Sequence, residues 1–263
     1  MIKTLSQVLA SFVVQTPYED LPVNVIEEAK RAALDFAGVA LGGSRTSIGK
    51  MITDFVHENS AQSKATVMGR GIRICAPDAA LANGVMGHVL ELDDTHFPSL
   101  THTGAAVVPA ALAVAETHGN SGRDLLSALV IGYDVALRIA NAIQPSHWKR
   151  GFMSASTAGS FGAAAACAKL LGLSEEKTAN ALGLAGTQAC GVMESIYTQN
   201  PGDDGKRLNP AKAAYNGVVS ALLAQKGFTG PSTILEGERG FFSAFSDKSN
   251  PSLITKGLGT SYE

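Results

Sequence analysis

The chain has 263 residues and a formal net charge of −2 at pH 7, with 17% charged and 45% hydrophobic residues. No run of lysine and arginine exceeds two residues, which excludes the basic surface typical of a nucleic-acid-binding protein. No uninterrupted apolar run reaches the ~18 residues of a membrane span, and the N-terminal segment lacks the apolar core of a secretory signal. We therefore expect a cytoplasmic protein that contacts no membrane.

Most of the chain repeats its apolar residues at intervals of three and four, which predicts helices. Glycine, proline and capping residues bound these helices at residues 22–43, 47–59, 78–93, 105–118, 122–143, 156–171, 175–190 and 210–225. Residues 64–77 alternate around Gly69 and Gly71, which predicts a small β-hairpin. Residues 227–245 indicate a loop followed by a short helix. The expected fold is mostly α: one helical domain over residues 1–263 with a single hairpin.

The low charge also predicts that a second protein covers part of the surface. Alanine-rich helices pack closely, and a large apolar exterior is usually an interface, so we expect a homodimer. In the run "GSFGAAAA", Gly159 and Gly162 predict a close contact between helices. No strand precedes this run, so it is not a nucleotide-binding turn. Cys75, Cys167 and Cys190 lie far apart, as expected of reduced packing residues.

The stretch "GHVLELDDTHFPSLTHTGAAVVPA" (residues 87–110) concentrates ionisable groups. Six ionisable side chains fall within fifteen positions: His88, Glu91, Asp93, Asp94, His96 and His102. If the helix over 78–93 is regular, His88, Glu91 and Thr95 lie along one side of it. Asp93 and Asp94 then fall at its C-terminus, where negative charge opposes the helix dipole. So costly a cluster predicts a functional site.

Other interpretations of this stretch remain open. The helix that follows His102 offers free N–H groups suited to an anionic substrate. A metal site is an alternative, because Asp93, Asp94, His96 and His102 are acceptable transition-metal ligands, although their spacing matches none of the strong metal-binding motifs. Each residue alone is also compatible with a cap, a salt bridge or a surface position, so only the cluster as a whole points to function.

Nearly the whole chain resembles the MmgE/PrpD family, which includes 2-methylcitrate dehydratases, cis-aconitate decarboxylases and iminodisuccinate epimerases. The segments that carry the resemblance stand in family order: "AALANGVMGHVLELDDTH", "LTHTGAAVVPAALAVAE", "GFMSASTAGSFGAAAACAKLLGLS" and "GDDGKRLNPAKAAYNGVVSALLAQKGFTGPSTILEGERGFF". The resemblance implies a large all-helical domain that dimerises and a smaller α+β lid domain over the site. It also implies metal-free and cofactor-free proton transfer next to a carboxylate of a small polycarboxylate.

The resemblance also implies roles for individual residues. The family's acidic motif falls on Glu91, Asp93, Asp94 and Thr95, its histidine on His102 and its active-site lysine on Lys206. His102 is then the general acid and base, since histidine titrates near neutral pH. Lys206 holds a substrate carboxylate and stabilises developing charge, while Asp94 and Thr95 orient the histidine or a substrate hydroxyl. The remaining expected substrate contacts are His88, Glu91, Asp93 and Asn209.

Three departures from the family pattern bear on function. Met153 stands where the family has a second active-site histidine, and Asn209 stands where a histidine follows the motif lysine. By the same resemblance the lid domain is expected to be absent from residues 1–263, or to be supplied by a separate polypeptide. The leading hypothesis is a lyase of 2-methylcitrate dehydratase type acting on a di- or tricarboxylate. The alternatives are a decarboxylase or epimerase of the same family, or a non-catalytic helical dimer.

Overall fold

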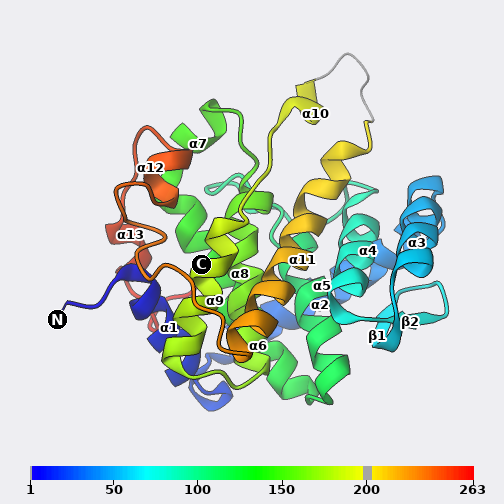
Figure 1. Ribbon diagram of the computed structural model, residues 1–263, viewed down its shortest axis with the longest axis horizontal. Coiled ribbons are helices and arrows are strands. Elements are labelled where there is room, and N and C mark those ends of the chain that lie inside the picture. Colours follow the sequence, from blue (N-terminus) through cyan, green and yellow to red (C-terminus); the bar gives the residue numbers. More distant parts are fainter. Residues whose placement is uncertain (1, 198–202) are drawn as a thin grey trace.

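Helices build almost the whole protein. The computed structural model describes residues 2–197 and 203–263 (Figure 1). The helices in this part are α1 (Leu5–Gln15), α2 (Val23–Gly43), α3 (Ser47–Asn59), α4 (Ala76–His88), α5 (Gly104–His118), α6 (Gly122–Ile143), α7 (Ser146–Lys149), α8 (Ser154–Leu170), α9 (Glu175–Thr187), α10 (Glu194–Tyr197), α11 (Gly205–Gln225), α12 (Phe241–Phe245) and α13 (Ser252–Thr255). A 3-10 turn, η1 (Tyr18–Asp20), and the strands β1 (Gln62–Val67) and β2 (Ile72–Ile74) complete the fold. The prediction of a mostly α fold is confirmed.

The core is a bundle centred on α8. Helices α5, α6, α9 and α11 pack around α8, and α4 packs against both α5 and α11 (Figure 1). Nearly every side chain of α8 is buried, and most of these side chains are alanine, serine or glycine. Small side chains let helix backbones approach closely, which explains how one helix can contact four neighbours.

The predicted glycine contact lies at the centre of this bundle. A Cβ added to Gly162 of α8 would lie 2.5 Å from the carbonyl oxygen of Gly132 in α6, and one added to Gly132 would lie 2.9 Å from the carbonyl oxygen of Gly162. At Gly159 an added Cβ would lie 2.9 Å from the Cβ of Ala106 in α5. The backbones of α6 and α8 therefore touch where the sequence predicts a close contact.

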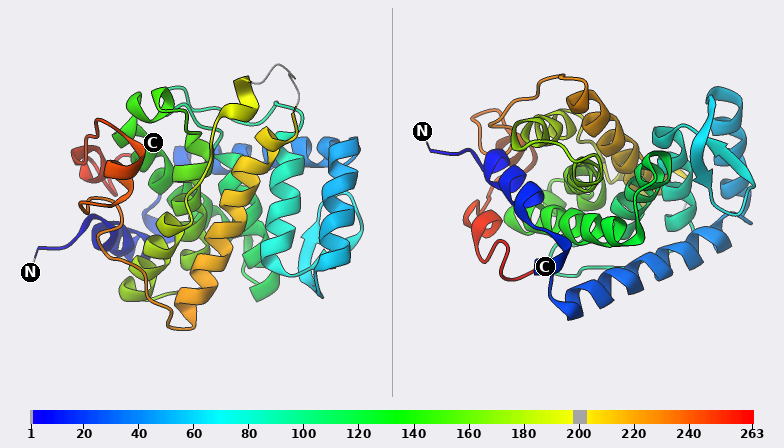
Figure 2. Two further views of the ribbon diagram at one scale, coloured as in Figure 1. Left: turned by 45° about the horizontal axis from the view of Figure 1, so that its top comes forward. Right: turned by 90° about the horizontal axis from the view of Figure 1, so that it is seen from below.

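The elements at the periphery frame the bundle. Helix α2 runs across one side of the molecule and leads to α3 and the hairpin (Figure 2). Strands β1 and β2 pair antiparallel, and Gly69 and Gly71 between them have φ values of 67° and 68°, a left-handed conformation that favours glycine. The predicted hairpin is confirmed, as is the short helix after the loop that begins at residue 227.

Helix α6 tests the membrane prediction. Within the described ranges it is the one helix long and apolar enough to cross a bilayer, and 83% of its apolar window is buried inside the protein. A core helix of a folded domain has this property. Of the cysteines, Cys167 is buried in the core as predicted, whereas Cys190 is exposed.

Some helix boundaries differ from the predicted ones. Helix α1 was not predicted, although Thr4 and Gln7 form a capping box at its start. Helix α4 ends at His88 and not at Asp93, because the chain turns at Glu91, where φ is 54°. Helix α11 begins at Gly205, five residues before the predicted start at Pro210, and therefore carries Lys206 on its first turn.

Candidate active site

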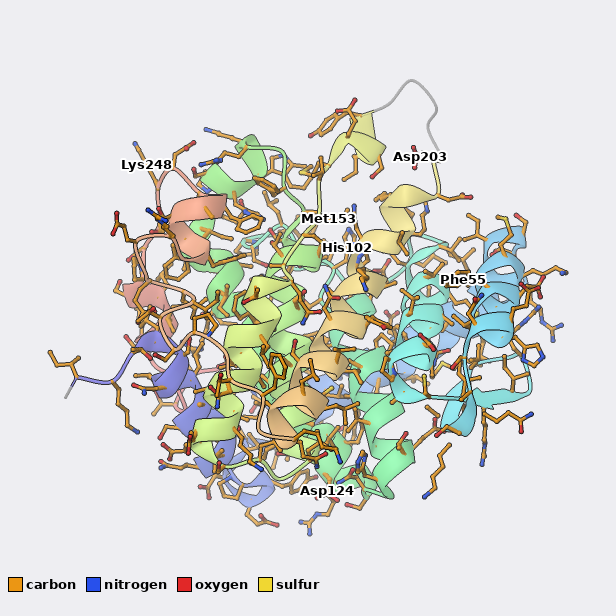
Figure 3. The ribbon with its side chains drawn as sticks, viewed as in Figure 1. Phe55, His102, Asp124, Met153, Asp203 and Lys248 are labelled. Carbon is orange, nitrogen blue, oxygen red and sulfur yellow. The ribbon has the colours of Figure 1, made fainter. Side chains whose placement is uncertain are left out.

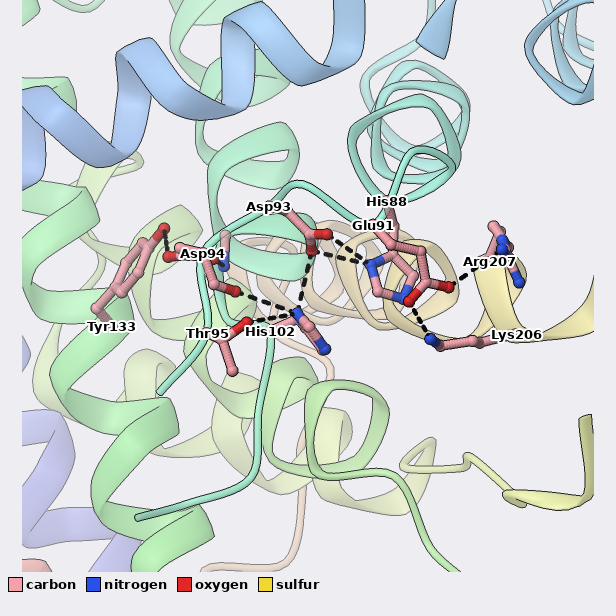
Figure 4. Close-up of polar contacts among 10 residues, drawn as sticks. His88, Glu91, Asp93, Asp94, Thr95, His102, Tyr133, Lys206 and Arg207 are labelled. Carbon is pink, nitrogen blue, oxygen red and sulfur yellow. Dashed lines mark hydrogen bonds and ion pairs between the residues drawn. The ribbon is translucent and has the colours of Figure 1, made fainter. Parts of the chain in front are cut away.

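The loop between α4 and α5 carries most of the predicted site. After the left-handed turn at Glu91, a short antiparallel bridge joins His96 to Thr101, with N···O distances of 2.9 and 3.3 Å. This bridge folds the loop back, so that Thr95 and His102 lie next to each other (Figure 4). The prediction that His88, Glu91 and Thr95 share one helical face is therefore wrong, because the helix ends first.

His102 is held through one ring nitrogen. Its Nδ1 lies 3.2 Å from the backbone carbonyl oxygen of Asp94 and 3.2 Å from Oγ1 of Thr95. A carboxylate oxygen of Asp93 lies 3.6 Å from the same nitrogen. Because a carbonyl oxygen can only accept a hydrogen bond, Nδ1 carries the proton, and Nε2, which has no hydrogen-bond partner among the described residues, can exchange protons. The side chain is 27% exposed.

Asp93 connects two histidines. Nδ1 of His88 lies 2.9 and 3.1 Å from the two carboxylate oxygens of Asp93, and the rings of His88 and His102 are 5.0 Å apart (Figure 4). Both His88 and Asp93 are buried, and Nε2 of His88 has no partner among the described residues. Asp93 contacts both histidines, so both buried side chains can hold His102 in place. Their predicted role in substrate binding stays a prediction.

The side chain of Asp94 points away from His102. It accepts hydrogen bonds from the hydroxyl of Tyr133 at 2.8 Å and from the backbone N–H of Gly104 at 2.9 Å. Burial raises the pKa of Asp94, although both hydrogen bonds act in the opposite direction. Asp94 therefore occupies one N–H group at the start of α5, so the expectation that these groups are free for an anionic substrate is wrong for Gly104. Its backbone carbonyl and Thr95 are the groups that contact the histidine.

Asp94 and Tyr133 also line a cavity of about 350 Å³ between α2 and α6. Neither His102 nor Lys206 is among the residues that line it. The cavity and the histidine lie on different sides of Asp94, as Figure 4 shows for Tyr133 and His102. This cavity is therefore separate from the histidine cluster.

Lys206 binds Glu91 rather than standing free. Its Nζ forms a hydrogen-bonded ion pair with one carboxylate oxygen of Glu91, and Nη2 of Arg207 lies 3.1 Å from the other oxygen. Burial acts to raise the pKa of Glu91, but the hydrogen bond and charge of Lys206, with the charges of His88 and Arg207, lower it overall. Arg207 is not among the site residues predicted from sequence. The sequence signal for it is its position directly after Lys206.

The family assignment rests on a direct comparison. A family model described as the MmgE/PrpD N-terminal domain matches residues 7–254. The chain belongs to the MmgE/PrpD family.

The chain is also similar to curated members of this family. It is 32% identical to the cis-aconitate decarboxylase-like protein oryM of Aspergillus oryzae (strain ATCC 42149 / RIB 40), over 97% of the chain and 55% of that protein. It is 32% identical to the cis-aconitate decarboxylase of Homo sapiens, over 97% and 54% respectively. For the cis-aconitate decarboxylase of Aspergillus terreus the identity is 31%, over 88% and 48%. The chain spans about half the length of the curated relatives it matches.

Two residues depart from the pattern that the family resemblance implies. Met153 is buried at the start of α8, where it packs with Met193 and Ala155. An apolar side chain thus fills the position where the resemblance implies a histidine. Asn209 lies one turn after Lys206 on α11 and is half-buried, with its Nδ2 3.4 Å from the carbonyl oxygen of Val192.

The ligand set for a metal differs from the one considered on sequence. The structure brings one atom each of His88, Asp93 and His102 within 4.8 Å of one another. His96 and Asp94 do not join them, because Nδ1 of His96 lies 2.7 Å from Oγ of Ser99 and Asp94 binds Tyr133. The same three groups form the hydrogen-bonded network around His102, so a metal and this network are competing interpretations of one cluster.

Proposed function

We propose that this MmgE/PrpD chain carries the proton-transfer part of a decarboxylase site for an unsaturated tricarboxylate of the cis-aconitate class. Two lines support the proposal. The three relatives described above are named as cis-aconitate decarboxylases or decarboxylase-like. His102, held at Nδ1 and with no partner for Nε2 among the described residues, is the observation that carries it. Dehydration of 2-methylcitrate, the leading hypothesis from sequence, becomes the alternative because the relatives described above are named as decarboxylases or decarboxylase-like.

The chemistry requires a proton at carbon. When a carboxylate leaves an allylic carbon as CO₂, its bonding electron pair forms a new double bond. The old double bond then shifts its electrons to the carbon next to a second carboxylate, which becomes enolate-like and must be protonated. A protonated His102 donates the Nε2 proton to that carbon, and the neutral ring keeps its Nδ1 proton.

The surrounding groups favour this proton transfer. The carboxylate of Asp93 lies 3.6 Å from Nδ1 of His102, and Thr95 and the Asp94 carbonyl fix the plane of the ring. Lys206 supplies positive charge for a substrate carboxylate and for the enolate-like intermediate. Figure 4 shows His102 on the loop, joined to His88 through Asp93, and Lys206 on α11, paired with Glu91.

The test is turnover of defined acids, with products observed by NMR. The purified chain is incubated with cis-aconitate, 2-methylcitrate and iminodisuccinate, alone and with a polypeptide that supplies the C-terminal half of a relative. Loss of CO₂ from cis-aconitate is expected, and it should survive a metal chelator. Turnover of 2-methylcitrate alone would favour the dehydratase alternative, and loss of activity with the chelator would favour the metal site.

The absence of any turnover and of any binding would overturn the proposal and favour a non-catalytic helical dimer. Met153 supports testing for a non-catalytic dimer, because a methionine side chain cannot donate or accept the proton that a histidine would transfer. Homodimer formation, a separate lid polypeptide and a cytoplasmic location belong to the same proposal.

A further inference from the structure

Two adjacent cations bind one carboxylate in the site. Lys206 contacts Oε2 of Glu91, and Arg207 contacts Oε1 at 3.1 Å. Neighbouring residues on a helix normally point in different directions. They converge here because Glu91 lies against the first turn of α11 and presents a different oxygen to each cation (Figure 4).

The arrangement is costly without an anion. The side chains of Lys206 and Arg207 are only 17% and 15% exposed, and buried cations need a partner. Both lie on the first turn of a helix, where the dipole disfavours positive charge. Glu91 reaches them from a left-handed backbone conformation, with φ at 54°, that L residues adopt only at a cost. The ion pairs of Glu91 with Lys206 and Arg207 offset the cost of burying the two cations and of the left-handed backbone at Glu91.

We infer that Lys206 and Arg207 together form a fork for one substrate carboxylate, and that Glu91 occupies this subsite until the substrate displaces it. The inference deepens the function proposed above, because it identifies Arg207 as the residue that selects a planar carboxylate. A lysine alone is a point charge, whereas an arginine beside it fixes the plane of the bound group. Among the described contacts, Nε of Arg207 has no partner.

The charges of the trio Lys206, Arg207 and Glu91 explain why a substrate carboxylate can displace Glu91. Two cations and one carboxylate leave a net positive charge, which attracts an incoming carboxylate. Once the substrate carboxylate takes the place of Glu91, both cations keep a partner and the chain at Glu91 can leave its left-handed conformation. Glu91 at 38% exposed is the member of the trio that can move into solvent.

The experiment measures the dissociation constant of cis-aconitate for three variants. Arg207→Gln should raise Kd roughly 10- to 100-fold, as expected for loss of a charge-assisted contact. Glu91→Gln should lower Kd by roughly 3- to 10-fold, because the competing carboxylate loses its charge. Arg31→Gln is the matched control, since this arginine lies on α2, is 76% exposed and pairs with Glu28; its Kd should equal that of the unmodified chain.

NMR of the Arg207 side chain locates the bound acid directly, since its Nε–H signal should shift when cis-aconitate or succinate is added.

Unchanged Kd for Arg207→Gln, or weaker binding for Glu91→Gln, would overturn the inference even if turnover occurs. Carboxylate binding at Arg207 without turnover would overturn only the proposed function, and no binding would overturn both. If Arg207→Gln does not fold, Arg207→Lys keeps the charge and should show an intermediate Kd.

Discussion

The hydrogen-bond partners of His102 and His147 indicate which ring nitrogen of each carries a proton. His102 faces a carbonyl, a hydroxyl and a carboxylate with one nitrogen. His147 is buried on α7, where its Nδ1 donates to the carbonyl oxygen of Phe245 and the hydroxyl of Thr157 donates to its Nε2. The first histidine keeps one nitrogen available for chemistry, whereas the second has both nitrogens occupied and serves the fold.

For His102 we expect a loss of function without a loss of stability. His102→Gln removes the proton donor, so decarboxylation should fall by at least ~100-fold, the lower end of what general acid catalysis supplies. The thermal midpoint should change little, because the side chain is partly exposed. His96→Gln is the matched control from the same loop and should keep activity. A variant of His102 that unfolds would show that the histidine is structural.

For His147 we expect a specific dependence of stability on pH. Burial lowers its pKa from 6.5 to about 4. The unfolded histidine binds a proton below pH 6.5 and the folded one does not until about pH 4, so unfolding takes up a proton in this window. The free energy of unfolding should therefore have its full value above pH 6.5 and should fall by about 3 kcal/mol as the pH drops to 4.

The measurement is denaturant unfolding between pH 4 and pH 7 for the unmodified chain and for His147→Gln. The variant should show a shallower decline towards low pH. His57→Gln, which changes an exposed histidine at the end of α3, should retain the decline of the unmodified chain. Equal declines for all three proteins would contradict the assignment to His147.

At the level of elements, helix periodicity was sufficient to place most of the helices but not the residues that end them. The pattern predicted a helix through Asp93, and the chain leaves the helix after His88 because Glu91 turns back toward α11. No local signal marks this turn, since glutamate is a good helix former. The ion pair with two residues more than a hundred positions away stabilises it.

The glycine contact between α6 and α8 gives a prediction for stability. Gly162→Ala should lower the free energy of unfolding by about 1–3 kcal/mol, because the new methyl group meets backbone that cannot move aside. Gly38→Ala is the matched control: it lies on the exposed side of α2 with nothing within 4 Å of an added Cβ. That change should stabilise the protein by about 0.4–1 kcal/mol. Chemical denaturation measures whether the free energy of unfolding falls for Gly162→Ala and rises for Gly38→Ala.

At the level of the whole molecule, the exterior carries large apolar side chains that the fold leaves uncovered. Leu34 on α2 is 75% exposed, and Met51 and Phe55 on α3 are 53% and 55% exposed. Figure 3 shows Phe55 near one edge of the molecule and His102 near its centre. Low overall charge and this exposed apolar surface agree with the proposed homodimer, although other partners can cover the same residues.

We expect a dimer in sedimentation experiments, with twice the 27.2 kDa mass of the chain. Since dimers dissociate on dilution, the measurement is made over a range of concentrations that includes the one used for activity. A monomer throughout that range would contradict the proposal. Phe55→Glu and Leu34→Glu then indicate which helix lies in the interface, because a buried charge disrupts it.

Sequence patterns alone determined the helical class, the hairpin, the glycine contact and the membership in the MmgE/PrpD family. Each of these features is encoded by residues that are close together in the chain or by the order of motifs along it. Both can be read from periodicity and motif matching. Only the tertiary structure showed that Tyr133 binds Asp94 across 39 positions and that Glu91 lies between Lys206 and Arg207 across 115. Such contacts arise from helix packing, which brings distant side chains together in directions that local pattern does not specify.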